Sequence, residues 1–63
     1  MKTIDPVTRA VTLIRSRLRD GEQLEALAGR LGVSYRTVAR WAAGQFSPTT
    51  NTARRVCATL EAR

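Results

Sequence analysis

The very short connection between two apolar stripes near the middle of this chain constrains its fold more than any other feature. The first stripe recurs at the spacing of a helix and consists of Leu24, Leu27, Ala28 and Leu31. Only Gly32 and Val33 separate it from Ser34, a residue type that commonly caps the start of a helix. Two short helices joined this closely share a core only when they cross steeply, which brings their backbones together at one point. We expect the small side chain of Ala28 to lie at that point.

A further helix is predicted before this pair. Asp5 and Pro6 are typical of a helix start. The Asp5 carboxylate can accept hydrogen bonds from backbone N–H groups of the first turn, and a backbone N–H at the position of Pro6 would have no partner within the helix. The helix is predicted over residues 6–19, and its inward stripe is Val7, Ala10, Val11, Ile14 and Leu18.

Another helix is predicted after the pair. Gly44 is placed to end the third helix, and a loop over residues 45–48 follows. The fourth helix is expected to begin after one of three alternative caps, which are Thr49, Thr50 and Asn51. Its inward stripe is Ala53, Val56, Cys57 and Leu60, where Cys57 is expected to act as a small buried hydrophobe. The chain is therefore predicted to be all-α, with four short helices, or five, in a single domain over residues 1–63.

The charge of the chain indicates the kind of partner it binds. Eleven Lys and Arg residues against five Asp and Glu residues give a net charge of +6 in 63 residues, and all but one of the basic residues are arginine. An excess of this size favours a polyanion, either a nucleic acid or an anionic membrane surface.

The composition also excludes several classes of protein. The chain has no His and a single Cys, so it offers no zinc ligand set, no internal disulfide and no His-based acid or base. We therefore expect no enzyme, no metal and no cofactor. The longest apolar run is three residues, and the first residues lack the apolar stretch of a secretory signal. These features predict a cytoplasmic, nucleoid-associated protein that is not a membrane protein.

The most specific signal is the spacing within residues 24–44. Counted from Leu24, the small Ala28 is fifth and Gly32 is ninth, and buried apolar groups are expected at Leu27, Leu31, Val33, Val38 and Trp41. Residues 27–41 read LAGRLGVSYRTVARW, which resembles the LAxxLGVSxxTVxRW pattern of the DNA-binding helix-turn-helix family. Gly44 and Pro48 resemble the flanks of its Cro and lambda-repressor-like subgroup. The subgroup usually has Gln at the position of Leu24, and Glu-Asn in place of Ala42-Ala43.

The resemblance implies a compact lambda-repressor-like domain with a recognition helix at about residues 34–43. With Val38 pointing inward, Arg36 and Arg40 lie on the opposite face one turn apart. A helix fits the major groove of DNA, where arginine bonds the O6 and N7 atoms of guanine. Two exposed arginines on a helix usually contact only solvent, but the surrounding motif favours base contacts here. We predict base contacts from Arg36, Arg40, Tyr35 and Ala39, although Tyr35 has packing against the preceding helix as an equal alternative.

Phosphate contacts are predicted around the recognition helix, because the start of a helix is a natural anion site. The candidates are Ser34, Thr37, Arg30, Gln45, Thr49 and Arg54, and Arg55 is a candidate beside Arg54. The remaining arginines of the first helix are expected to supply general electrostatics, and these are Arg9, Arg15, Arg17 and Arg19. Trp41 is expected to be a core residue rather than a stacking platform for a base.

These features predict a sequence-specific transcriptional repressor that binds double-stranded DNA and regulates its own gene. One such helix contacts few base pairs, so we expect a homodimer on a palindromic operator, with an interface on the fourth helix and the C-terminus, together with Phe46 and Leu13. Without an effector domain, it would act by excluding polymerase. A small chain of this kind, with one DNA-binding domain, resembles phage Cro-type repressors and the small regulators that accompany anti-CRISPR genes. Two alternatives are a DNA-binding accessory in recombination, transposition or partition, and an antitoxin-type protein-interaction module.

Overall fold

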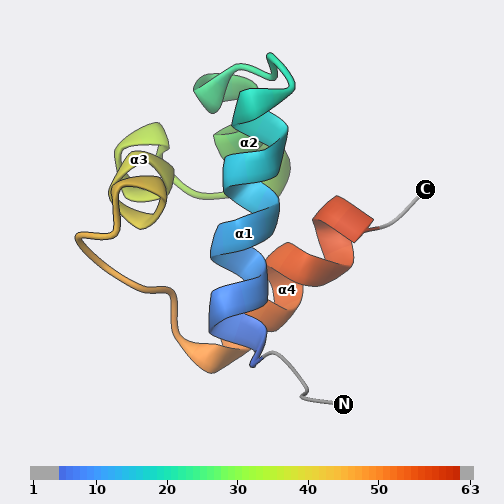
Figure 1. The fold of residues 1–63 in the computed structure, drawn as a ribbon, viewed down its shortest axis with the longest axis vertical. Coiled ribbons are helices and arrows are strands. Elements are labelled where there is room, and N and C mark those ends of the chain that lie inside the picture. The colour runs from blue at the N-terminus through green and yellow to red at the C-terminus, as the bar shows by residue number, and fades with distance from the viewer. Residues whose placement is uncertain (1–4, 62–63) are drawn as a thin grey trace.

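The computed structural model describes residues 5–61, and over these residues the chain forms four α-helices and no strand (Figure 1). The helices are α1 (Pro6–Arg19), α2 (Leu24–Leu31), α3 (Tyr35–Ala43) and α4 (Thr50–Glu61). The predicted all-α fold of four short helices is confirmed, and a fifth helix has no place among the described residues.

The predicted helix starts are formed by side-chain caps. Asp5 Oδ1 accepts a hydrogen bond from the Thr8 amide at 2.9 Å, and this bond holds the pKa of Asp5 below its usual value. Ser34 Oγ accepts the amide of Thr37 at 3.2 Å at the start of α3. Among the three caps considered for α4, the structure has Thr49, whose Oγ1 accepts the amide of Thr52 at 3.3 Å.

Glycines in the left-handed conformation end the two central helices. Gly32 closes α2 with φ of +72°, and its amide and that of Val33 bond back into the last turn of α2. Gly44 closes α3 in the same way with φ of +81°. Side chains with a Cβ rarely adopt this conformation, so both turns depend on glycine.

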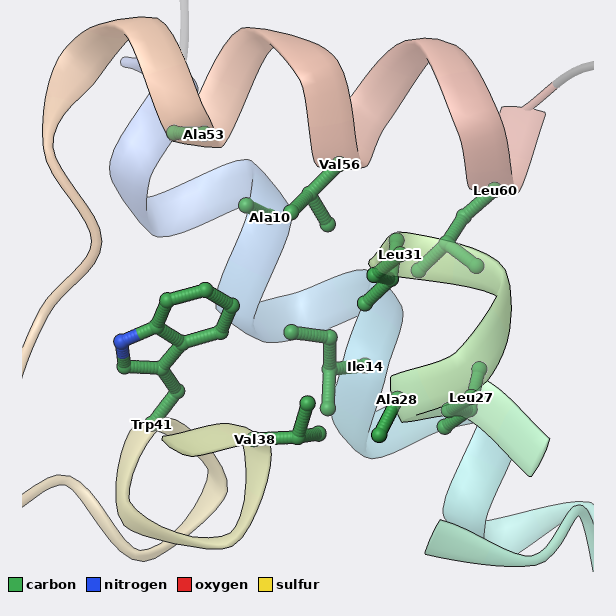
Figure 2. Close-up of a cluster of buried hydrophobic side chains, with 10 residues drawn as sticks. All are labelled: Ala10, Ile14, Leu27, Ala28, Leu31, Val38, Trp41, Ala53, Val56 and Leu60. Carbon is green, nitrogen blue, oxygen red and sulfur yellow. The ribbon is translucent and has the colours of Figure 1, made fainter. Parts of the chain in front are cut away.

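One core collects apolar side chains from all four helices (Figure 2). Ile14 of α1 lies in its middle, Val38 and Trp41 enter from α3, and Trp41 is only 6% exposed, as a core residue should be. The full set of buried residues is Ala10, Ile14, Leu27, Ala28, Leu31, Val38, Trp41, Ala53, Val56 and Leu60.

Several residues of the predicted inward stripes are only half-buried. Val33 lies in the turn between α2 and α3, where one side of the backbone faces solvent. Cys57 was expected to be buried, but it packs against the core from the edge of the α1–α4 contact, with its Sγ 3.8 Å from the Pro6 carbonyl oxygen. Other half-buried stripe positions are Leu24 in α2 and, in α1, Val7, Val11 and Leu18. Pro48 is buried, which the apolar stripes did not predict because it lies in a loop.

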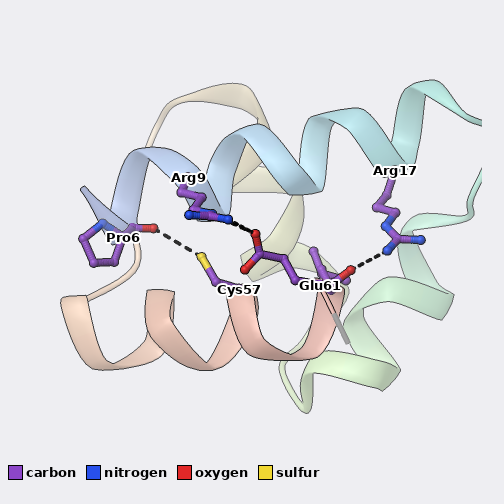
Figure 3. Close-up of polar contacts among 6 residues, drawn as sticks. Pro6, Arg9, Arg17, Cys57 and Glu61 are labelled. Atoms are coloured by element: carbon purple, nitrogen blue, oxygen red, sulfur yellow. Dashed lines mark hydrogen bonds and ion pairs between the residues drawn. The ribbon is translucent and has the colours of Figure 1, made fainter. Parts of the chain in front are cut away.

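Arginines of α1 bind the ends of other helices, which corrects the expectation that they supply only general electrostatics. Arg15 Nε donates to the carbonyl oxygen of Ala42, in the last turn of α3, at 2.9 Å. Arg17 donates to the Leu60 carbonyl oxygen in the last turn of α4, and Arg9 forms an ion pair with Glu61 (Figure 3). The last carbonyl groups of a helix lack partners and carry partial negative charge, so they attract guanidinium groups.

Candidate nucleic-acid interface

Contacts on three sides hold α3 in place. Its inward side chains, Val38 and Trp41, are buried in the core shared with α1 and α2. The cap at Ser34 fixes its start, while Arg15 and the turn at Gly44 fix its end. These contacts leave the opposite face of α3 available to a partner.

The exposed face of α3 is positively charged. Arg36 and Arg40 are both exposed, as the sequence predicted, and among residues 5–61 neither has a carboxylate within ion-pair distance. Tyr35 begins the helix and is 53% exposed, while the smaller Ala39 is half-buried beside the two arginines. This face therefore combines two guanidinium groups with a small neighbouring side chain, which allows a close approach to a polyanion.

The ring of Phe46 lies against Arg40. The guanidinium carbon of Arg40 is 5.4 Å from the centre of the ring, within the range of a cation–π contact. The sequence predicts Phe46 to lie in a dimer interface and does not predict this contact. The signal for it was the turn at Gly44, which reverses the chain between the two residues.

The hydroxyl groups predicted to contact phosphate lie at helix starts, where those of Ser34 and Thr49 also act as caps. Ser34 Oγ and Thr37 Oγ1 share a hydrogen bond of 2.8 Å at the start of α3. Thr49 Oγ1 donates to Thr52 Oγ1 at 3.0 Å at the start of α4. All three hydroxyl groups lie at helix starts, where the partial positive charge of the helix favours an anion.

The other phosphate candidates lie in different surroundings. Arg30 bonds Glu22 at 2.8 Å, which neutralises part of its charge. Gln45 is exposed in the loop after α3, and its backbone N–H donates to the Arg40 carbonyl oxygen at 3.0 Å. Arg54 lines a shallow groove whose walls come from α1 and α4 alone, and Arg55 is exposed on α4. The structure thus gathers Gln45 with the α3 residues and places Arg54 in a separate surface feature.

The tight turn between α2 and α3, the buried Ala28 and the basic outward face of α3 together define a helix-turn-helix DNA-binding unit. The sequence profile of the helix-turn-helix family matches residues 16–62 of the chain. The chain therefore belongs to the helix-turn-helix family, in its lambda-repressor-like XRE type, whose members are DNA-binding transcriptional regulators and not enzymes.

Two other comparisons were made, with curated proteins and with solved structures, and neither produced a significant match. Over residues 5–61, no helix combines the length and the apolar character that a membrane crossing requires.

Proposed function

We propose that this regulator is a repressor that binds an inverted-repeat operator as a homodimer, with α3 of each copy in the major groove. The observation that supports this most is the outward face of α3, where Arg36 and Arg40 have no carboxylate partner among residues 5–61. Guanidinium groups that carry no intramolecular carboxylate partner are available to bond the O6 and N7 atoms of guanine in the major groove.

Each part of this face has a distinct role in the proposed complex. Arg36 and Arg40 contact guanine edges, Tyr35 contacts a base or a phosphate at the start of the helix, and Ala39 lies against a thymine methyl group. The hydroxyl groups of Ser34, Thr37 and Thr49, together with Gln45, orient the helix on the phosphate backbone. Arg30 and Arg54 add phosphate contacts at the margins.

The need to distinguish an operator from other DNA sequences favours binding by two copies of the chain. One recognition helix contacts few base pairs, whereas a genome offers a very large number of competing sites. A homodimer contacts two half-sites about one helical turn apart, which multiplies the discrimination. Leu13 is half-buried against the core and Phe46 contacts Arg40, so the exposed side of α4 remains the best position for the interface.

Repression by occupancy follows from this arrangement, because an operator covered by the dimer is closed to polymerase. We propose that the operator lies beside the regulator's own gene. Footprinting of the DNA flanking that gene tests the proposal, and the expected result is a protected inverted repeat whose protection is lost in Arg36→Ala. Arg19→Ala is the matched control, because Arg19 is an exposed arginine outside α3.

Titration at two salt concentrations separates this function from the alternatives. A protein that neutralises phosphates releases counterions, so its affinity must fall steeply as salt rises. A protected site within a recombination or partition locus instead of a promoter would favour the accessory role. Absent binding, or binding that does not respond to salt on any sequence, would contradict the DNA-binding function and favour a protein-interaction module.

A further inference from the structure

Phe46 is an exposed aromatic residue on a very small protein, and its position calls for an explanation. It is 59% exposed, and with Tyr35 it is one of two large hydrophobic side chains exposed in the part of the chain that the structure describes. Its ring faces the guanidinium group of Arg40 at 5.4 Å. The aromatic ring therefore touches a residue that the proposed function assigns to base contacts.

The backbone holds Phe46 in this place from both sides. On one side, the turn at Gly44 is closed by the hydrogen bond from the backbone N–H of Gln45 to the Arg40 carbonyl oxygen, at 3.0 Å. On the other side, Pro48 is buried and Thr49 caps α4. The loop backbone is thus tied to the fold on both sides of Phe46, which keeps this residue beside the end of α3 and within reach of Arg40.

A ring in this position restricts the side-chain conformations of Arg40 and leaves its N–H groups available as donors. An arginine side chain loses substantial rotamer freedom when it is ordered, which lowers the affinity of any contact it makes. Stacking over a ring uses the face of the guanidinium plane, whereas bonds to a base use the N–H groups at its edge. Arg40 can therefore be oriented by Phe46 and still present its N–H groups to DNA.

We propose that Phe46 is a specificity-determining residue, which acts by positioning the Arg40 guanidinium group for contact with one guanine. This inference rests on the proposed DNA-binding function and adds to it a residue outside α3. It predicts that the identity of residue 46 affects discrimination at the base pair contacted by Arg40, and at no other base pair.

The contact itself is tested first, on the free protein by NMR. A ring stacked on Arg40 shifts the side-chain proton resonances of that arginine upfield. The shift is expected in the wild type and in Phe46→Tyr, and it should disappear in Phe46→Leu, which keeps an apolar side chain without a ring. Equal Arg40 resonances in the wild type and Phe46→Leu would overturn the proposal.

The consequence is tested by binding to the footprinted operator and to a copy with the Arg40 base pair changed. Phe46→Leu should weaken operator binding about two- to fivefold, leave binding to the altered operator nearly unchanged, and leave the salt dependence unchanged. Phe46→Tyr should restore the wild-type affinity. In an Arg40→Ala background, Phe46→Leu should have no further effect, because the two residues act as a unit.

In the binding measurements, two further results would overturn the proposal without affecting the proposed function. One is an equal loss on both operators, which indicates a phosphate contact by Arg40 or by the loop. The other is a wild-type affinity in Phe46→Leu. Failure of the wild type to bind any DNA would instead contradict the proposed function, and this inference with it. Equal melting temperatures of the wild type and Phe46→Leu confirm that the fold is intact in these measurements.

Discussion

Helices α1 and α3 are both rich in arginine, and they use it in opposite ways. On α1, Arg15 and Arg17 donate to carbonyl oxygens in the last turns of α3 and α4, and Arg9 pairs with Glu61. On α3, Arg36 and Arg40 have no carboxylate partner among the described residues, and Arg40 only stacks against a ring. On α1, three guanidinium groups are therefore engaged within the fold, and on α3 they face solvent.

The cause of this difference is the packing of the helices. The side chains of α1 reach the C-terminal ends of both α3 and α4, where carbonyl groups lack partners and the helix dipole is negative. The outward face of α3 contacts no helix end in residues 5–61. A guanidinium group beside a helix end stabilises the fold, and one that faces solvent remains free for a ligand. We therefore propose that the position of an arginine, and not the number of arginines on a helix, identifies the DNA interface.

The largest expected effect is a loss of stability when the packing that holds α3 is disrupted. Ala28 is 4% exposed and belongs to the core between α2 and its neighbours, so Ala28→Leu has no room for its larger side chain. Overpacking of this kind should lower the free energy of unfolding by about 1–3 kcal/mol, or about 5–20 °C in the melting temperature. Thermal unfolding followed by circular dichroism measures it.

Gly29→Ala is the matched control on the same helix. A Cβ at Gly29 meets no atom within 4 Å, and alanine has the higher helix propensity. This variant should be as stable as the wild type or more stable. An Ala28→Leu variant with the wild-type melting temperature would contradict the close approach of α2 and α3.

The next effect concerns binding alone. Arg36→Ala should lower the affinity for the operator by about 1–3 kcal/mol and leave the melting temperature unchanged, because its guanidinium group has no partner within residues 5–61. Equilibrium binding to labelled operator DNA measures the loss. A marked fall in stability, with affinity retained, would show that Arg36 supports the fold as the arginines of α1 do.

The reverse pattern is expected for α1. Arg17→Met keeps the apolar part of the side chain but removes the hydrogen bond to the Leu60 carbonyl oxygen. The free energy of unfolding should fall by about 1 kcal/mol, since the bond is charge-assisted but partly open to solvent. Arg19→Met, which removes an exposed arginine of the same helix, should change stability less. Equal stabilities of the two variants would remove the basis for the comparison between α1 and α3.

The smallest effect is a dependence of stability on pH at the start of α1. The hydrogen bonds from Thr8 hold the pKa of Asp5 below its usual value, so the charged form is favoured in the folded state. The resulting stability is present above the unfolded pKa, about 3.9, and is lost as pH falls through the lower folded value. Asp5→Asn should lack this contribution. The difference in melting temperature between the wild type and Asp5→Asn should therefore shrink as the solution is acidified below about pH 4.

Local patterns in the sequence predicted most of the fold. The caps at Asp5 and Ser34, the turn glycines and the stripes around Ile14 and Val38 each depend on residues within a few positions of one another. For the same reason, the exposure of Arg36 and Arg40 followed from the inward position of Val38.

Contacts between distant segments could not be predicted in this way. Arg17 and Leu60, or Arg15 and Ala42, are brought together only by the packing of whole helices. The contact between Phe46 and Arg40 is closer in sequence, and the turn at Gly44 was a local signal for it, but the path of the irregular loop that carries the ring follows no periodic pattern.

The most direct test of the difference between the two helices is an NMR titration of the labelled protein with its operator DNA. We expect the largest amide shift changes on residues 34–40 and on the loop at Gln45 and Phe46. The amides next to Arg9, Arg17 and Glu61 should change little, because those side chains bind other parts of the fold. Changes concentrated on α1 and the groove beside α4, with α3 unaffected, would contradict the assignment of the interface to α3.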